Sequence, residues 1–428
     1  MRRAFFIMMN YGQIHRGAVR PYREGKLMLE SDVDRYRVID TDTHVIEPYD
    51  LWTSRIDVRK WGDKVPHVRF DEAMHEDAWY FGEQRVGPAA ASAQAGWAEF
   101  PPKHPPSLSV VDRGTWDSAA RLDVMDEYGI WAAVLYPNVA GFGAGKVLTL
   151  GDGELMLACV RAYNDFLSEF SSIAPNRYIP IMALPFWDLA ACEREIARCV
   201  DLGHKGAIMT GEPFFWGMPK LADPHWDRLW AVLQEAGLSV NFHIGSGDMS
   251  IFDRAYEHAG EHANYAGFGV QFGIGNVTVI ANLITGGVCH RFPNLKFVSV
   301  ESGVGWLPFA LRHLDWQWLN CGVPKEHPEY DLLPTEYFQR QMYGCFWFED
   351  ETLKSAIDQL GPGCLLYESD FPHPTSMAPG PATIAVQPRE YIAQQLGDLD
   401  DNVLRRILHD NAAELYHLDE HALAPGPF

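Results

Sequence analysis

The sequence predicts a single (β/α)₈ TIM barrel with an N-terminal extension and a cap insertion after the first strand. The chain has 428 residues, a normal length for one such barrel with insertions. Strand-like apolar runs alternate with helical stretches, and several runs are continuously apolar, as in parallel strands buried on both faces. This alternation also fits an open doubly wound sheet. Ionisable residues at the ends of several strands favour the barrel, whose active sites lie at that end.

The expected elements follow the chain in a regular order. Helical patterns between the strands stop at Gly129, Gly203, Gly237 and Gly361, and glycine is a common helix terminator. We expect an extension over residues 1–35, a barrel over 36–420 with its cap at 51–117, a second insertion at 321–340 and a loose tail at 421–428. The eight expected strands are Arg37–Asp42, Trp131–Asn138, Ile179–Pro185, Lys205–Gly211, Ser239–Gly245, Lys296–Ser302, Met342–Phe348 and Cys364–Asp370.

Composition limits the classes of partner and the compartment. Lys and Arg number 35 and Asp and Glu 57, a net charge of −22 that argues against nucleic acid and anionic membranes. Seven cysteines without a CxxC pair indicate buried free thiols in a reducing compartment. The apolar run after the first arginines is too short for a signal peptide, and no run suggests a membrane-spanning helix. We therefore expect a cytoplasmic protein that acts on a small molecule and forms a homo-oligomer.

The end of the first strand carries the first candidate site residues. Residues two apart on a strand point to the same face, so Asp42 and His44 share one face, with Asp40 deeper in the same register. A lone Asp-x-His is also typical of a turn or helix cap at the end of a strand. The motif indicates a functional site only if other strands also end in ionisable residues.

Three further strands also end in an ionisable residue. The fifth ends at His243, the sixth at Glu301 and the eighth at Asp370, with His373 three residues on. Burying such residues is costly unless they are paired or bind a cation. The pattern predicts a metal site. Imidazoles with carboxylates suit Zn²⁺, Mn²⁺ or Fe²⁺ better than Ca²⁺ or Mg²⁺.

Several motifs together resemble the amidohydrolase superfamily. They are Asp42-Thr43-His44, the strand that ends at His243, FPNLKFVSVESGVGWLP at 292–308, SDFPH at 369–373 and ILHDNAAELYHLD at 407–419. The most similar branch is that of the aminocarboxymuconate-semialdehyde decarboxylases and related aromatic-acid decarboxylases. The resemblance covers about residues 36–420. It implies a barrel with one divalent metal ion in its mouth, held by Asp42, His44, His243 and Asp370.

The chain departs from that family pattern at two positions. The decarboxylases carry a histidine at the end of strand six, where this chain has Glu301. The dinuclear hydrolases of the superfamily bridge two metals with a carboxylated lysine at the end of strand four. Here Lys205 stands at the start of that strand and Thr210-Gly211-Glu212 at its end, which argues against a lysine bridge.

Four functions follow from these residues. We favour hydrolysis, in which Glu301 is the base for a metal-activated water and Asp370 shares the proton role. Decarboxylation comes second and requires Glu301 to protonate carbon, with a raised pKa. Oxygen activation at a dinuclear Fe or Mn centre comes third, with Glu301, His243 and His373 as further ligands. The last alternative is a non-catalytic, metal-binding partner subunit.

Some residues have two interpretations. His373 is a candidate catalytic residue, or it ties down the loop after Pro372. Four aromatic residues are candidates for the pocket lining or for ordinary core: Trp97, Phe142, Trp216 and Trp306. Three other histidines are expected at the surface or in the substrate pocket rather than on the metal: His258 and His262, which would share a face if helical, and His290.

Overall fold

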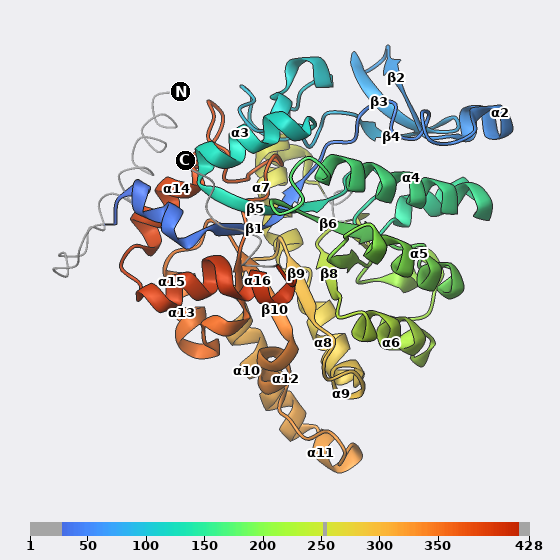
Figure 1. Cartoon of the computed structure of the whole chain (residues 1–428). Coiled ribbons are helices and arrows are strands. Elements are labelled where there is room, and N and C mark those ends of the chain that lie inside the picture. The colour runs from blue at the N-terminus through green and yellow to red at the C-terminus, as the bar shows by residue number, and fades with distance from the viewer. Residues whose placement is uncertain (1–27, 251–254, 419–428) are drawn as a thin grey trace.

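Eight parallel strands form one sheet in simple chain order, as the sequence predicts (Figure 1). The structure is a computed structural model and describes residues 28–250 and 255–418. Seven of the strands are shorter than the runs that predict them, because each of these runs continues beyond the last strand pairing, whereas β1 extends past its expected end at Asp42 to His44. They are β1 (Val38–His44), β5 (Ile130–Tyr136), β6 (Tyr178–Ala183), β7 (Gly206–Ile208), β8 (Ser239–His243), β9 (Phe297–Val300), β10 (Met342–Phe346) and β11 (Leu365–Tyr367).

The segment that follows β11 closes the barrel against β1. Thr43 forms a parallel bridge with Phe371. The backbone N–H of His44 donates to the carbonyl of Phe371 at 2.7 Å, and that of Asp370 donates to the carbonyl of Asp42 at 2.9 Å. Closure therefore brings the end of the first strand beside the residues that follow the last one. The (β/α)₈ barrel is confirmed.

Helices surround the sheet, and aspartates begin several of them (Figure 1). The side chains of Asp117, Asp152 and Asp188 each accept a backbone N–H from the first turn of the helix that follows, which satisfies donors that the helix itself leaves unpaired. The main barrel helices are α3 (Ser118–Tyr128), α4 (Gly153–Ser171), α5 (Leu189–Asp201), α6 (Asp227–Glu235), α8 (Val277–Thr285), α10 (Leu307–Asn320), α13 (Glu351–Leu360), α15 (Asp401–Arg405) and α16 (Asn411–Leu415). Shorter or peripheral helices are α2 (Val58–Trp61), α7 (Glu261–Gly273), α9 (Val288–Arg291), α11 (Val323–Glu326), α12 (Pro334–Gln341) and α14 (Pro388–Tyr391).

The insertion after β1 contains a small antiparallel sheet that sequence patterns did not indicate. Its strands are β2 (His67–Asp71), β3 (Glu76–Phe81) and β4 (Gln84–Pro88). Trp52 anchors this sheet, because its ring lies 5.0 Å from that of Trp79 and its indole N–H donates to a carbonyl of α4. Further along, the backbone N–H groups of Gln94 and Ala95 donate to the carbonyl of Pro372 at 2.9 and 3.1 Å. The insertion therefore contacts the loop after β11, at the C-terminal end of the barrel.

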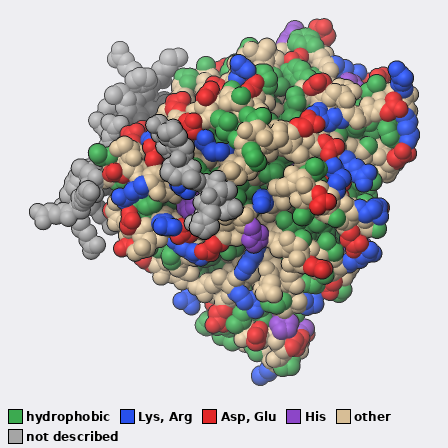
Figure 2. Space-filling view, viewed as in Figure 1, with side chains coloured by type: hydrophobic (Ala, Val, Ile, Leu, Met, Phe, Trp, Pro, Cys, Tyr) green, Lys and Arg blue, Asp and Glu red, His purple; other side chains and the backbone are tan. Residues whose placement is uncertain are grey.

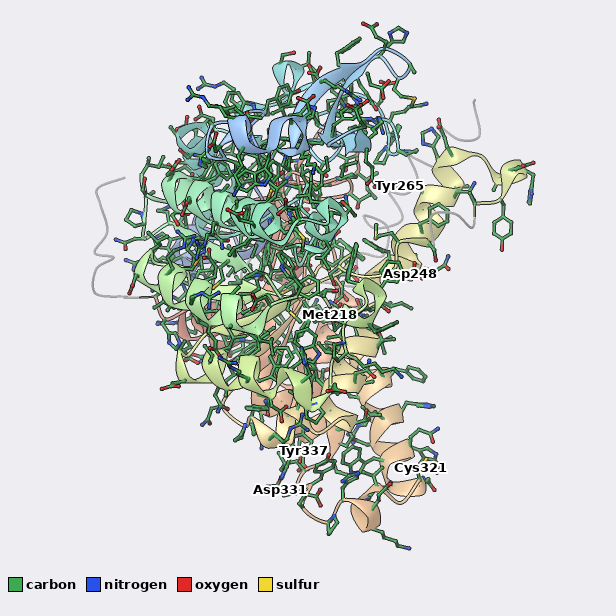
Figure 3. The ribbon with its side chains drawn as sticks, turned by 90° about the vertical axis from the view of Figure 1, so that its right-hand side faces the viewer. Met218, Asp248, Tyr265, Cys321, Asp331 and Tyr337 are labelled. Carbon is green, nitrogen blue, oxygen red and sulfur yellow. The ribbon has the colours of Figure 1, made fainter. Side chains whose placement is uncertain are left out.

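The helical stretch Glu261–Thr285 differs from what the sequence analysis expected. By length and composition alone it would be long enough to cross a membrane, although only 28% of its most apolar window is buried. The two helices within it, α7 and α8, differ in their packing. Val279, Ile280 and Leu283 of α8 are buried in the core. In contrast, α7, which contains the labelled Tyr265, projects beside the barrel (Figure 3). Val270 of α7 is 71% exposed.

His258 and His262 are both exposed, in keeping with a place at the surface. His258 lies in a 3-10 turn before α7 and His262 within α7, so they do not share a helix. Cys321 is exposed, while the other six cysteines are buried and free as expected. The face shown in Figure 2 carries interspersed acidic and basic side chains rather than one continuous charged field.

Candidate metal centre and active site

Six ionisable side chains meet at the C-terminal end of the barrel, as their positions at strand ends predict. Their possible ligand atoms form three overlapping groups, each with all its atoms within 4.8 Å of one another. The first group is Asp42, His44 and His243, the second His44, Asp370 and His373, and the third Asp42, Glu301 and Asp370. Each of these groups is composed and spaced so that it can hold a divalent cation.

The two histidines of the first group have their protonation fixed by the backbone. His44 Nδ1 lies 2.9 Å from the carbonyl oxygen of Pro137, and His243 Nδ1 lies 2.7 Å from that of Ile244. A carbonyl oxygen only accepts, so each neutral imidazole carries its proton on Nδ1 and directs the lone pair of Nε2 into the site. The two Nε2 atoms lie 3.0 Å apart. Two lone pairs that face each other at this distance need a cation between them, either a proton or a metal ion.

Asp42 supplies the carboxylate for these imidazoles. Its Oδ1 lies 3.3 Å from His44 Nε2 and its Oδ2 lies 3.4 Å from His243 Nε2. Neither oxygen accepts a hydrogen bond within the described part of the chain, although the residue is fully buried. Burial works to raise the pKa of Asp42, but the positive charge that His243 and His44 carry when protonated outweighs it and lowers that pKa. A buried carboxylate that stays ionised beside two imidazoles fits a metal ligand.

Glu301 and Asp370 are held close together in an unusual backbone conformation. Their φ angles are 53° and 60°, in the left-handed region that residues other than glycine rarely adopt. Glu301 Oε2 lies 3.4 Å from His243 Nε2, and Asp370 Oδ1 lies 3.6 Å from His44 Nε2. Burial and then the charge of Asp370 raise the pKa of Glu301 well above its usual value. Left-handed residues of this kind concentrate at functional sites.

His373 joins the site from the loop after β11. Its ring stacks on that of His44, with centroids 3.6 Å apart. Nδ1 lies 2.9 Å from Asp370 Oδ1, and Nε2 lies 2.6 Å from Asn138 Oδ1. Burial, followed by the charge of His243, lowers the pKa of His373 to about 3. His373 is thus placed both to orient Asp370 and to fasten its loop to the end of β5.

The aromatic residues suggested by sequence divide into two kinds. The Phe142 ring lies 3.9 Å from that of His243 and 5.2 Å from that of His44, so Phe142 lines the site. Trp216 and Trp306 donate their indole N–H groups to the carbonyls of Ser246 and Ser302. Outside the site, His290 faces Tyr337 and Asp331, and His262 contacts the carbonyl of Pro101.

Sequence reasoning missed one acidic residue beside the site. Glu368, directly after β11, is fully buried, and its Oε2 accepts the backbone N–H of Glu301 at 3.1 Å. The available signal was its spacing: Glu368 and Asp370 are two residues apart, as Asp40 and Asp42 are. Of these four, Asp40 accepts backbone N–H groups from Asp42 and Ser369.

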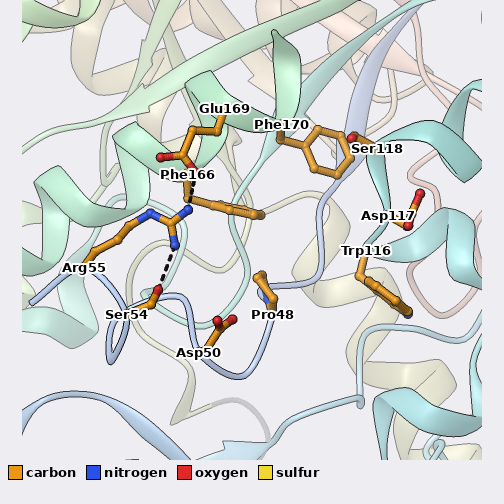
Figure 4. A pocket seen from close by; sticks show the side chains of 10 residues that line it. All are labelled: Pro48, Asp50, Ser54, Arg55, Trp116, Asp117, Ser118, Phe166, Glu169 and Phe170. Atoms are coloured by element: carbon orange, nitrogen blue, oxygen red, sulfur yellow. Dashed lines mark hydrogen bonds and ion pairs between the residues drawn. The ribbon is translucent and has the colours of Figure 1, made fainter. Parts of the chain in front are cut away.

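Figure 4 shows a separate pocket of about 630 Å³. It lies between the segment after β1, α3 and α4, and its lining includes Phe166 and Phe170. Two of its lining residues, Arg55 and Glu169, form an ion pair. It shares no residue with the six clustered side chains, so we place the chemistry at the barrel mouth.

The fold and the candidate site together define a barrel whose clustered ionisable side chains stand at the C-terminal ends of its strands, where barrel enzymes have their active sites. The family model described as Amidohydrolase matches residues 39–418. The chain therefore belongs to the amidohydrolase family.

Individual relatives agree with this placement. A gamma-resorcylate decarboxylase of Rhizobium radiobacter is 26% identical over 264 residues, which cover 59% of this chain and 76% of the relative. A 2-amino-3-carboxymuconate-6-semialdehyde decarboxylase of Dictyostelium discoideum is 22% identical over 318 residues, which cover 72% and 79% respectively. The fold matches that of an amidohydrolase from Mycobacterium avium subsp. paratuberculosis K-10, with a TM-score of 0.69, 24% identity and coverage of 89% of this chain and 99% of that one.

Proposed function

We propose that this enzyme is a metal-dependent, non-oxidative decarboxylase of a small aromatic or muconate-type acid. The observation that carries the proposal is that the two relatives described above, a gamma-resorcylate decarboxylase and a 2-amino-3-carboxymuconate-6-semialdehyde decarboxylase, are both decarboxylases. They support decarboxylation better than hydrolysis, which the sequence analysis placed first. The cytoplasmic location and the homo-oligomeric state stay predictions.

The proposed ligands of one divalent ion are Asp42, His44, His243 and Asp370. Their fit is supported by the facing Nε2 lone pairs and by the carboxylate of Asp42, which accepts no hydrogen bond among the described residues. A mixed set of imidazoles and carboxylates suits Zn²⁺, Mn²⁺ or Fe²⁺. When bound, such an ion polarises an oxygen of the substrate and stabilises negative charge that develops there.

The remaining residues of the site take part in the transfer of a proton to the substrate. Decarboxylation breaks the bond between carbon and the carboxylate, releases CO₂ and leaves an electron pair on carbon that must take up a proton. We assign this proton to Glu301, whose carboxyl lies in one group with Asp42 and Asp370. His373, which is hydrogen-bonded to Asn138, holds Asp370 in place through the contact of its Nδ1 with Asp370 Oδ1 at 2.9 Å. Phe142 covers the imidazoles and excludes water from them.

Hydrolysis is the second candidate, and one specific feature favours it. Glu301 stands where the decarboxylase pattern has a histidine, and a carboxylate is a suitable base for water. The dinuclear oxygenase remains as a third candidate, because six donor residues exceed what one ion needs.

The test is a product assay on metal-loaded enzyme with a panel of hydroxybenzoates, aminobenzoates and their amides. Release of CO₂ from an acid without consumption of oxygen supports the proposal. Cleavage of the amides alone would instead establish hydrolysis, and oxygen uptake would establish oxygenation. The Asp42→Ala variant is the control for activity from contaminating enzymes.

A further inference from the structure

The backbone of Glu301 adopts a conformation that needs support. Glu301 follows directly after β9, and its φ of 53° turns the chain out of the strand. This turn brings the carboxyl to 3.4 Å from His243 Nε2. A left-handed conformation is unfavourable for a residue with a Cβ, so such residues persist where surrounding contacts fix them.

The side chain of Glu368, which lies two strands away, supports the backbone of Glu301. Glu368 belongs to the segment after β11, and β10 lies between β11 and β9. The backbone N–H of Glu368 donates to the carbonyl of Phe346 at the end of β10. Its side chain then reaches past β10, where Oε2 accepts the N–H of Glu301 at 3.1 Å. The donor that β9 leaves unpaired at its end is satisfied in this way.

The same carboxyl has no evident use in stabilising the fold. Glu368 is fully buried, and its Oε1 accepts no hydrogen bond within residues 28–250 and 255–418. It belongs to none of the three groups that can hold a metal ion. A buried carboxyl with so few partners is unfavourable for folding. Besides its neighbour Cys345 on β10, the contact that its side chain makes is with the backbone N–H of Glu301.

Asp370 provides an internal comparison. It also has a left-handed backbone, with φ of 60°, but its N–H donates to the main-chain carbonyl of Asp42. The support of Asp370 is therefore part of the closure of the barrel. That of Glu301 is a side chain, which one substitution can remove.

We propose that Glu368 is a positioning residue, which holds Glu301 in its left-handed conformation and so directs the Glu301 carboxyl toward His243. This inference rests on the proposed role of Glu301 in proton transfer. Glu368 acts on the reaction only through Glu301. Its removal should therefore lower kcat and leave KM and metal content nearly unchanged.

The test compares Glu368→Leu, which has no acceptor, with Glu368→Gln, which keeps an amide oxygen for the Glu301 N–H. We expect Glu368→Leu to lower kcat about 10²-fold, the cost of misplacing a catalytic group by about 1 Å. Glu368→Gln should recover most of that loss. The double variant Glu301→Gln/Glu368→Leu should be no slower than Glu301→Gln alone, because residues that act through one another are not additive. Additive losses would overturn the proposal.

Glu349→Leu is the matched control. Glu349 is also a buried glutamate that accepts backbone N–H groups of the loop after β9, but at Val304 and Gly305. An equal loss of kcat in Glu349→Leu would show general loosening of the loop and refute a specific role. Crystal structures of Glu368→Leu and Glu368→Gln give a readout that needs no substrate. An unchanged Glu301 φ in Glu368→Leu overturns the inference, whereas a wild-type enzyme that releases no CO₂ overturns only the proposed reaction.

Discussion

His44 and His243 face each other across the barrel mouth with their Nε2 atoms 3.0 Å apart, while each Nδ1 donates to a main-chain carbonyl. The backbone thus prevents either ring from reversing its tautomer to relieve the contact. The arrangement is favourable only with a cation at the centre. The two histidines are the last residues of β1 and β8, so a cation bound between them would hold the ends of these two strands together.

The first prediction is that His243→Ala loses the metal ion. Removal of a ligand should weaken binding at least as much as loss of a residue that orients one, which costs about 10–100-fold. After dialysis, elemental mass spectrometry should find less metal per chain in His243→Ala than in the wild type. His290→Ala is the control, because His290 lies outside the site. Unchanged metal content in His243→Ala would rule out the assigned ligands.

The second prediction concerns removal of the metal by a chelator. Without the cation, the buried carboxylates of Asp42 and Asp370 lose their counter-charge, so the apoenzyme should unfold at a lower temperature. A metal at about 100 times its Kd stabilises the folded state by about 2.7 kcal/mol. Calorimetry should show the melting temperature restored on addition of Mn²⁺ or Zn²⁺. If Asp42→Ala shows the same rise on metal addition, the stabilisation comes from another site.

The third prediction is that Glu301→Gln is slow but still binds metal. The substitution keeps the shape of the side chain and removes the proton-transfer group, so kcat should fall about 10²–10⁴-fold. Metal content should stay near that of the wild type. Loss of one of two bound ions would instead identify Glu301 as a ligand and favour the dinuclear oxygenase. Full activity would exclude both roles.

Residue patterns predicted the barrel and its site to different extents. The eight strands and the meeting of Asp42, His243 and Asp370 follow from the positions of charged residues after apolar runs, since parallel strands share one C-terminal end. The contact from Glu368 to Glu301 could not be predicted in this way. It depends on a left-handed residue and on a side chain that passes an intervening strand, and neither leaves a periodic signal.

The insertion after β1 shows the same limit. A cap was expected there, but the strands β2 to β4 were missed, because β2 and β4 contain no buried residue and the apolar run of β3 is limited to Ala78–Phe81. The helix α7 was missed because of its glycine content. Its glycines at 267, 269 and 273 disfavour a helix by propensity, and the structure overrides that preference.

The last prediction concerns pH and a histidine far from the metal site. His204 lies between α5 and β7, is 2% exposed, and contacts Ser168 Oγ through Nε2 at 2.9 Å. Burial lowers the pKa of His204 from 6.5 to about 4. Between these values the unfolded chain binds a proton that the folded protein does not, so His204 should reduce stability as the pH falls from about 6.5 to about 4. The full effect is about 3 kcal/mol.

The measurement is the melting temperature at a series of pH values between about 4 and 7. The difference between wild type and His204→Phe should change over this interval, because only the wild type carries this buried imidazole. The exposed His225 provides the control, since His225→Phe should follow the wild-type curve. A His204→Phe curve parallel to that of the wild type throughout would show that His204 does not protonate on unfolding. The sign is also diagnostic, because a histidine stabilised in its charged form would make the wild type relatively more stable at low pH.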